Sequence, residues 1–358
     1  TPTVEIAYKE LGKEIADLWV FGTAKNLLDH YFTSEKTKLY MGMTVIESGP
    51  ASIYDPGTAF TIPLMDSGSV FDGYWGFVKT GIWKITETLT DINLNLGVRV
   101  YLDSSITEVD TRSKIISFVK DNKDEKLHYD HLIFATDPVT PSKLIKGFKQ
   151  DIELDEIGTS GKVTAFFRNP VKWKESNEYS DSFRFIFSNN NLNKFEEASQ
   201  NALKNSGDYF AGFIQVYPDG SAQRTMNNKE SYDKLILFTK NLSYDKKADD
   251  LDKVKDEIIK SVLPYIENAD DLVCSKFLTP KDLNETFFFP KGNIDHITLS
   301  GKQNYNKRTL SSNPSNFYSY YNYQDIYYCG AGSFPCGSVA GTAGYMCSKQ
   351  LIRNDKKG

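Results

Sequence analysis

The chain has 358 residues, of which 40% are hydrophobic and 25% charged, and its formal net charge is −5. This length and composition are typical of a soluble globular protein of about two domains and exclude a disordered chain. The acidic balance gives no general attraction to nucleic acid or to an anionic membrane, so neither is expected as a partner.

The sequence predicts an intracellular, soluble protein of the cytoplasm or of a mitochondrial or plastid matrix. No apolar run approaches the roughly 18 residues of a membrane-spanning helix, and no signal peptide is recognised at the start. None of the cysteines forms a C-x-x-C pair, so reduced intracellular thiols are favoured. The four are Cys274, Cys329, Cys336 and Cys347.

The first predicted element is an amphipathic helix over residues 9–31, where apolar side chains recur at helical spacing. His30 lies at its end, where the helix dipole favours a histidine, so a catalytic role is not expected. Residues 33–72 are interpreted as turn-rich because prolines and glycines punctuate them. A second helix is predicted from about Gly81 to residue 96.

The hydrophobic period then changes to two, which predicts strands. We expect strands over residues 98–102, around Val109 and Phe118, and over residues 129–135. A charged turn at residues 120–126 separates the last of these from the others. His128 and His131 lie at the start of that last strand, where ordinary surface positions are the favoured interpretation.

Residues 157–240 predict further strands, and residues 247–266 predict an amphipathic surface helix. No internal repeat is found. The order of helix, strands, mixed sheet, helix and a final strand–glycine loop–helix predicts an α/β or α+β fold with two interleaved domains.

The most informative stretch is IYYCGAGSFPCGSVAGTAGYMCSKQLI, residues 326–352. A strand leads into Gly330-Ala331-Gly332, where the missing Cβ atoms permit close approach, and a helix follows from about Val339. A helix N-terminus suits a pyrophosphate or a flavin edge. However, Pro335 replaces the third glycine of the dinucleotide fingerprint, and no second strand with an acidic residue follows. By pattern alone, a glycine-rich helix entry packed tightly on a sheet is at least as well supported.

Several segments together resemble the phytoene-desaturase-like FAD-dependent oxidoreductases of the flavin amine oxidase superfamily, in particular the branch of mitochondrial pyridine nucleotide-disulfide oxidoreductase domain proteins. Their order and spacing agree with the family from about residue 25 to the end. The segments are LLDHYFTSEKTKLYMG with DPGTAF, GYWGFVKTGIWKITETL, LGVRVYLDSSITEV, HLIFATDP, LTPKDLNETFFFPKGNIDHI and IYYCGAGSFPCGSVAGTAG.

The resemblance implies the later two-thirds of a two-domain flavoprotein, an incomplete Rossmann-like FAD domain interleaved with a mixed-sheet substrate domain. Residues 1–72 would be a helical part of the substrate domain and 73–148 a returning segment of the FAD domain. Residues 149–295 would form the rest of the substrate domain, and 296–358 would return to the FAD domain. A second polypeptide or a missing N-terminal segment is expected to complete the FAD domain, and the face around strand 326–329 is expected to be exposed or covered by it.

The resemblance also implies cofactor-binding positions. Ala135 and Thr136 would line FAD, the backbone of Ile106 would meet its adenine end, and Gly81 would lie near the ring. Residues 330–332 would follow the ribityl and pyrophosphate, and the amides of residues 339–340 would face the pyrimidine edge. The full set is Gly81, Ile106, Ala135, Thr136, Gly330, Ala331, Gly332, Gly337, Ser338, Val339 and Ala340.

Asn293 and His296 would stand near the substrate by the same resemblance. His296 is the only catalytic candidate, and a hydrogen-bonded structural role is about as well supported. No metal site is expected.

The sequence departs from the family at three places, one of which is Asn284, where the family has an acidic residue. The family's G-G-M-G is Thr80-Gly81-Ile82-Trp83 here, and its H-P-G-G-G is Phe334-Pro335-Cys336-Gly337-Ser338. Three functions therefore stay open. The first is hydride transfer between flavin and an apolar, isoprenoid or lipid-like substrate held by the aromatic-rich region 157–290. The second is a catalytically inactive, flavoprotein-derived subunit of an assembly. The third is a binding protein for an apolar ligand without redox function.

Overall fold

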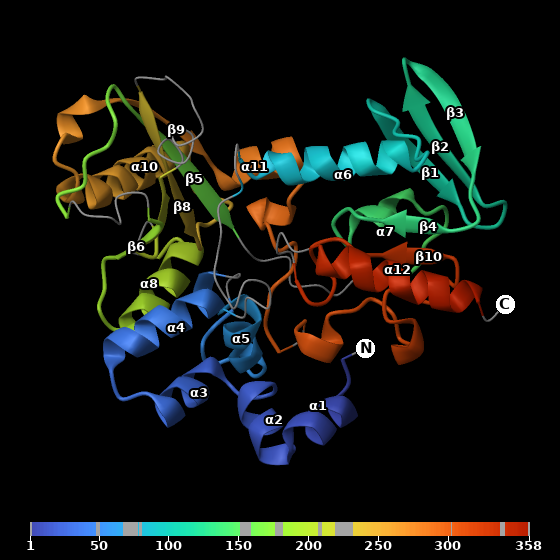
Figure 1. Ribbon diagram of the computed structural model, residues 1–358, viewed down its shortest axis with the longest axis horizontal. Coiled ribbons are helices and arrows are strands. Elements are labelled where there is room, and N and C mark those ends of the chain that lie inside the picture. Colours follow the sequence, from blue (N-terminus) through green and yellow to red (C-terminus); the bar gives the residue numbers. More distant parts are fainter. Residues whose placement is uncertain are drawn as a thin grey trace.

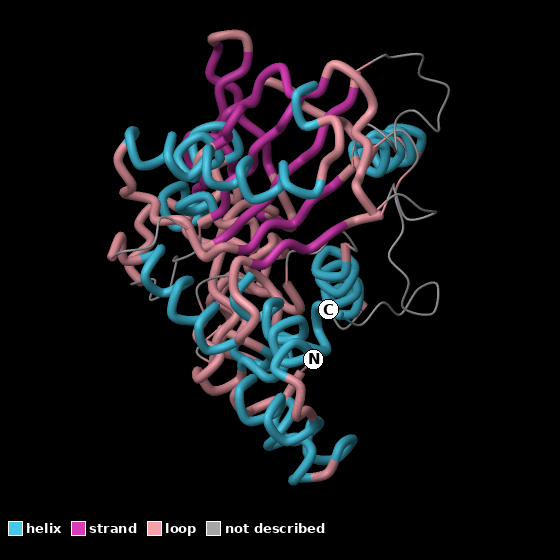
Figure 2. Tube along the Cα trace, turned by 90° about the vertical axis from the view of Figure 1, so that its left-hand side faces the viewer, coloured by secondary structure: helices cyan, strands magenta, loops and turns pink. Residues whose placement is uncertain are grey.

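The computed structural model describes residues 2–47, 51–66, 78, 81–150, 159–175, 182–206, 210–218, 232–301, 303–336 and 341–356. Helices and strands are mixed along these residues, and the strands form three sheets. This confirms the predicted α/β class. In Figure 2 the strands gather in one half of the molecule, and the other half is mostly helix and loop. No helix in the described ranges is long and apolar enough to cross a membrane.

The N-terminal segment forms three short helices, and the single helix predicted over residues 9–31 is wrong. Gly12 ends the first helix with a φ of +78°, a conformation that glycine adopts easily. At Gly22 an added Cβ would lie 2.5 Å from a backbone oxygen of the preceding helix. Thr23 then caps the third helix through its side-chain oxygen. The three are α1 (Val4–Leu11), α2 (Lys13–Trp19) and α3 (Ala24–Tyr31).

Residues 33–72 contain more helix than their turn-like composition predicted. Two helices lie here, α4 (Glu35–Glu47) and α5 (Thr61–Asp66). Burial of Met43 and Ile46 in the core shared with α3 and α8 (Leu192–Leu203) stabilises α4. Tertiary packing therefore outweighs the local turn signals. Short 3₁₀ turns occupy Thr58–Phe60, Leu263–Tyr265, Ala269–Asp271, Pro290–Gly292, Tyr305–Lys307 and Pro314–Asn316.

A five-stranded antiparallel sheet forms the centre of the middle region. Helix α10 (Ala248–Val262) covers one face with Val254 and Ile258 (Figure 1). The helical core that includes α4 and α8 covers the other face, where Phe213 packs. The strands predicted within residues 157–240 and the surface helix predicted over residues 247–266 are confirmed, whereas the fifth strand, over Leu272–Leu278, was not predicted. The sheet order is β6 (Arg184–Phe187), β7 (Phe213–Tyr217), β8 (Asp233–Lys240), β5 (Ser160–Phe167) and β9 (Leu272–Leu278).

A three-stranded antiparallel sheet follows α6 (Trp83–Asn95), the helix predicted from about Gly81. The charged turn predicted at residues 120–126 is wrong, because only Asp121 and Asn122 turn the chain, with φ of +50° and +58°. The strand predicted over residues 98–102 is also wrong. Every residue of 96–103 is described, and none is in a strand. The sheet contains β1 (Ser104–Asp110), β2 (Ile115–Lys120) and β3 (Lys123–His128).

The third sheet is a parallel pair of strands that are distant in sequence, β4 (Leu132–Phe134) and β10 (Ile326–Tyr328). Residues 318–320 cover the other edge of β10, where the backbone N–H of Tyr320 donates to the carbonyl of Ile326 at 2.8 Å. All three β10 residues are buried by this chain, and the expectation that a further segment covers the face beside this strand stays a prediction. Three more helices complete the described fold: α7 (Thr140–Leu144), α11 (Pro280–Phe287) and α12 (Thr342–Asp355).

Many of the exposed apolar side chains lie on α6 and the segment after it. No residue of α6 is buried, and Leu96 and Leu102 are 77% and 74% exposed. In the view of Figure 1 this helix lies between α11 and β1. We define the α6 surface by its exposed apolar residues: Ile82, Trp83, Leu89, Ile92, Leu94, Leu96, Val98, Val100 and Leu102.

Candidate functional site

The carboxyl ends of β4 and β10 meet at one edge because the two strands are parallel. Residues 135–139 follow β4, and the glycine loop, which we define as residues 329–336, follows β10. The backbone N–H of Cys329 donates to the carbonyl of Phe134 at 3.0 Å. Ala135 and Thr136, both exposed, therefore lie beside Gly330. In open α/β sheets this edge is where ligands bind.

Two glycines of the loop are required by contacts within the chain. A Cβ on Gly330 would lie 2.0 Å from the backbone oxygen of Thr136. A Cβ on Gly332 would lie 2.7 Å from the hydroxyl of Tyr328, which accepts from the Gly332 N–H at 3.1 Å. Burial raises the pKa of Tyr328, so its hydroxyl stays protonated. Tight packing of the loop, which the sequence left open, accounts for both glycines.

Open glycines are found further on, at the start of α12. Neither Gly341, with a φ of +67°, nor Gly344 has a heavy atom of the described residues within 4 Å of an added Cβ. Both are exposed, so the backbone there is accessible to a ligand. The predicted positions Gly337, Ser338, Val339 and Ala340 lie outside the described residues.

Arg308 holds the glycine loop in place, and this role was not predicted from the sequence. Its guanidinium is fully buried and donates to the carbonyls of Ala331 and Asp295, both at 3.0 Å. It also donates to the carbonyls of Ser333, Thr298 and Gln303. Five carbonyl acceptors thus tie the loop to the residues around Asp295. Nothing in the local sequence distinguishes this arginine from the adjacent lysine.

Arg308 is joined to the polar segment, which we define as residues 293–301 and 303–304. The carboxylate of Asp295 pairs with the buried ammonium of Lys240, at 3.0 Å, on β8. Arg308 uses the backbone carbonyl of the same aspartate. The polar segment therefore connects the five-stranded sheet to the glycine loop.

Asn293 and His296 lie on the polar segment with buried polar atoms that have no hydrogen-bond partner. Asn293 is 1% exposed and His296 is 9% exposed. The unpartnered atoms are Nδ2 of Asn293 and Nδ1 of His296, among the described residues. Leaving such a buried group unsatisfied costs roughly 1–3 kcal/mol. A ligand atom that pairs with either group would recover this cost.

His296 is held in a strained and desolvated position. Its φ of +65° is uncommon for a residue with a Cβ. Burial lowers the pKa of the imidazole, and the nearby Arg308 lowers it further, while the carboxylates of Asp137 and Asp295 oppose the shift. A neutral imidazole has one nitrogen that accepts and one that donates. Local strain of this kind clusters at functional sites.

The remaining predicted positions lie on other elements. Ile106 is 38% exposed on β1, where its cross-strand partner is Phe118. Gly81 lies two residues before the start of α6 and has a φ of +122°. The edge of β4 and β10 thus brings together Ala135, Thr136 and residues 330–332, and Arg308 adds the polar segment to them.

Comparison with known proteins confirms the resemblance found in the sequence, although no family model matches the chain. Pyridine nucleotide-disulfide oxidoreductase domain-containing protein 2 of Rattus norvegicus is 24% identical over 98% of this chain. The 4,4'-diapophytoene desaturase of Staphylococcus aureus strain Newman is 21% identical over 96% of this chain and 68% of its own length. The chain spans 64% of the length of the rat protein.

Solved structures show the same fold. A triple mutant of putrescine oxidase superposes with a TM-score of 0.56 and 13% identity, over 99% of this chain and 77% of its own. Cyclohexylamine oxidase of Brevibacterium oxydans gives a TM-score of 0.51 and 11% identity, over 99% and 76%. The related families are FAD-dependent oxidoreductases.

Proposed function

We propose that this chain, a relative of the phytoene-desaturase-like flavoproteins with the fold of the flavin amine oxidases, carries one half of an FAD site. The site would serve an oxidoreductase that moves hydride between an apolar substrate and the flavin. The observation that carries the proposal is the pair of buried, unpartnered groups on Asn293 and His296, joined through Arg308 to the glycine loop. The free-energy cost of burying these two groups without hydrogen-bond partners is recovered when the polar edge of a ligand pairs with them.

The described residues fit a flavin in part. Ala135 and Thr136 give an exposed wall after β4, and Gly341 and Gly344 give open backbone at the start of α12. Gly330 and Gly332 would support a flavin only indirectly, by letting the glycine loop pack closely, because the chain itself fills their Cβ positions. FAD, when bound, would supply the redox chemistry.

The chain's own residues would bind and orient. The amide Nδ2 of Asn293 can donate to a carbonyl-type oxygen, and the neutral imidazole of His296 can exchange a hydrogen bond through Nδ1. Arg308 would keep both near the glycine loop, because it bonds the carbonyls of Asp295 and Ala331. The buried surroundings of His296 would keep water from the polar edge of the ligand.

A further polypeptide segment would complete the FAD domain by covering the α6 surface. Nine apolar side chains of this surface are exposed, and large exposed apolar areas mark interaction sites. Whether that segment belongs to a longer form of this chain or to a partner is decided by the intact mass of the protein purified from its natural source.

The first test is the visible absorption spectrum of the protein purified from its source with its natural partners. We expect the bands of an oxidised flavin. If the intact complex contains no flavin and takes up none on titration with FAD, the oxidoreductase proposal is wrong.

The second test uses variants in that complex. Asn293→Ala and His296→Ala should each weaken FAD or substrate binding about tenfold, which corresponds to one lost hydrogen bond. His128→Gln, on exposed β3, is the matched control and should leave binding unchanged. Equal binding by all three variants would contradict the assigned positions.

A catalytically inactive, flavoprotein-derived subunit is the second candidate. One observation favours it: the chain's own atoms fill the space at Gly330 and Gly332. An intact complex that carries no flavin would support this candidate.

A further inference from the structure

Two of the four cysteines are in contact where β10 enters the glycine loop. Side chains alternate along a strand, and Tyr327 and Cys329 pack in the cluster beneath α12. Tyr328, between them, packs in the opposite core. Cys347 lies on the inner face of α12 and is 1% exposed. The thiols of Cys329 and Cys347 form a hydrogen bond with each other, so the fold has brought two sulfur atoms side by side.

The two thiols differ in exposure and in proton affinity. Cys329 is partly exposed, whereas Cys347 is buried. The hydrogen bond from Cys347 lowers the pKa of the Cys329 thiol, although burial opposes this shift. The same hydrogen bond and burial raise the pKa of Cys347. A reachable thiol that ionises readily, next to a second thiol that can resolve its oxidised form, is typical of a redox-sensitive pair.

The pair lies at the half of α12 that is nearest the candidate site. The C-terminal half of the helix is held by Gln350, whose Oε1 accepts from the backbone N–H of Tyr318 at 3.0 Å. Cys347 lies about one turn earlier, toward the exposed Gly341 before the first turn. A bond between Cys347 and Cys329 would therefore join the glycine loop to the part of α12 that carries the open backbone.

We propose that Cys329 and Cys347 are a peroxide-sensitive thiol pair, which closes reversibly to a disulfide and fixes α12 to the glycine loop. Cys329 is the thiol that reacts with the peroxide, and Cys347 is the thiol that resolves the product. This goes beyond the proposed function, because neither step needs a flavin or a substrate.

Hydrogen peroxide is the oxidant in this reaction. The thiolate of Cys329 attacks one peroxide oxygen, so that an S–O bond forms, the O–O bond breaks and hydroxide leaves. The thiol of Cys347 then attacks the Cys329 sulfur, so that the S–S bond forms and the S–O bond breaks. The protons of the two thiols convert both leaving hydroxides to water. Two thiols and one peroxide thus give one disulfide and two waters, and a dithiol reductant reverses the reaction by exchange.

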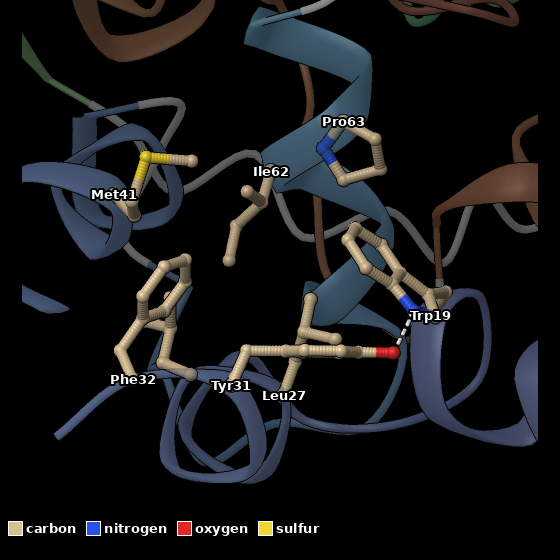
Figure 3. Close-up of a pocket in the computed structure, with 8 residues that line it drawn as sticks. Trp19, Leu27, Tyr31, Phe32, Met41, Ile62 and Pro63 are labelled. Carbon is tan, nitrogen blue, oxygen red and sulfur yellow. Dashed lines mark hydrogen bonds between the residues drawn. The ribbon is translucent and has the colours of Figure 1, made fainter.

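The chain contains its own reference for unspecific oxidation, Met41. Its thioether lines an apolar pocket of about 410 Å³ between the N-terminal helices, where Figure 3 shows it near Ile62. Met41 is partly exposed, and a thioether reacts with peroxide without first losing a proton. A thiol pair tuned for peroxide should therefore react at doses that leave Met41 unchanged.

The experiment treats the full, reduced chain with graded doses of hydrogen peroxide, blocks the remaining thiols with N-ethylmaleimide and maps the peptides by mass spectrometry without reduction. Cleavage by chymotrypsin after Tyr345 separates Cys347 from Cys329 and Cys336. We expect a disulfide-linked pair of peptides before any sulfoxide forms at Met41. The oxidised chain should also melt a few degrees higher than the reduced chain, and dithiothreitol should abolish the difference.

Three variants identify the two sulfur atoms. Cys329→Ala and Cys347→Ala should each abolish the linked peptides and the shift in melting temperature. Cys336→Ala is the matched control in the same loop and should leave both unchanged. In Cys347→Ala the thiol of Cys329 loses its hydrogen-bond donor, so its alkylation by iodoacetamide at neutral pH should slow about threefold to tenfold. Circular dichroism checks that the variants are folded.

The inference is overturned if the folded, unaltered chain gives no linked peptides by the dose at which Met41 becomes oxidised. It is also overturned if Cys347 remains linked in the Cys329→Ala variant, because its partner would then be another cysteine. These outcomes are independent of whether the protein carries FAD, which the absorption spectrum decides.

Discussion

The five-stranded sheet buries its apolar residues, whereas the α6 surface exposes them. In the sheet, both faces are covered by helices of this chain, and residues such as Val163, Val216 and Leu237 are at most 1% exposed. On α6 no residue is buried, although the helix contains Leu89, Ile92 and Leu94. Exposed apolar area costs roughly 25 cal/mol per Å², so the α6 surface is favourable only when something covers it.

The difference indicates which parts of the fold this chain specifies by itself. The sheet with its helices is closed within the described residues. The region of β4, β10 and α6 has a buried strand and an exposed helix, so only part of its apolar surface is buried. The following four predictions test this contrast.

The largest effect is expected where the two regions are joined, at the buried Lys240–Asp295 pair. Lys240→Met leaves the carboxylate buried and unpaired, which should lower the free energy of unfolding by about 3–5 kcal/mol. Urea denaturation followed by circular dichroism measures this. The control is Lys255→Met, which breaks a pair whose carboxylate, on Asp252, is 76% exposed, and it should cost at most about 1 kcal/mol. Equal effects would show that the pair does not connect the regions.

The second effect compares one truncation in both regions. Ile258→Ala, at a site that is 0% exposed on α10, should destabilise the protein by about 2–5 kcal/mol. Ile92→Ala, at a site that is 49% exposed on α6, should change stability by less than about 0.5 kcal/mol. Thermal denaturation of both variants measures these two changes in stability. A large loss for Ile92→Ala would mean that α6 is packed in the isolated chain.

The third effect concerns the two kinds of glycine near the site. Gly330→Ala forces a backbone displacement at Thr136 and should destabilise the protein by about 1–3 kcal/mol. Gly344→Ala meets open space in a helix and should stabilise it by about 0.5–1 kcal/mol. Chemical denaturation of the chain without ligand measures both. A neutral Gly330→Ala would contradict the packing role of the glycine loop.

The smallest effect is the pH dependence due to His296. Because folding lowers the pKa of His296 below its ordinary value of 6.5, the unfolded state binds the proton more tightly. The stability from the neutral imidazole is therefore fully present above pH 6.5 and is lost as the pH falls below it. Each unit of lowered pKa contributes about 1.4 kcal/mol. The unfolding free energies of the unaltered chain and of His296→Asn, measured from pH 5 to 8, should separate as the pH rises to about 6.5 and run parallel above it. Curves that are parallel over the whole range would contradict this.

The sequence predicted elements whose periodicity and packing agree. Helix α10 and strands β5 and β8 are examples, because their hydrophobic periodicity matches the faces that the fold buries. The prediction from sequence failed where a segment needs a partner strand in order to form a strand itself. Residues 98–102 alternate like a strand, but the described chain pairs no strand with them. It also failed at Gly12, because helical spacing continues across a residue whose φ ends the helix.

The candidate site was predictable only in part. The motif around Gly330 and the segment with Asn293 and His296 carry local patterns. Arg308 carries none, since its role depends on carbonyls from residues that only the fold brings together. The missing hydrogen-bond partners of Asn293 and His296 are likewise visible only in three dimensions.

The parallel pairing of β4 with β10 also has a consequence for the order in which the protein folds. The strands are separated by residues 135–325, more than half of the chain, so this contact closes a very long loop and is slow to form. During synthesis, β4 has to wait until the ribosome has released β10, while the five-stranded sheet can already assemble. The nascent chain therefore exposes β4 together with the α6 surface for most of that time. We expect this interval to be the one in which the protein depends most on molecular chaperones.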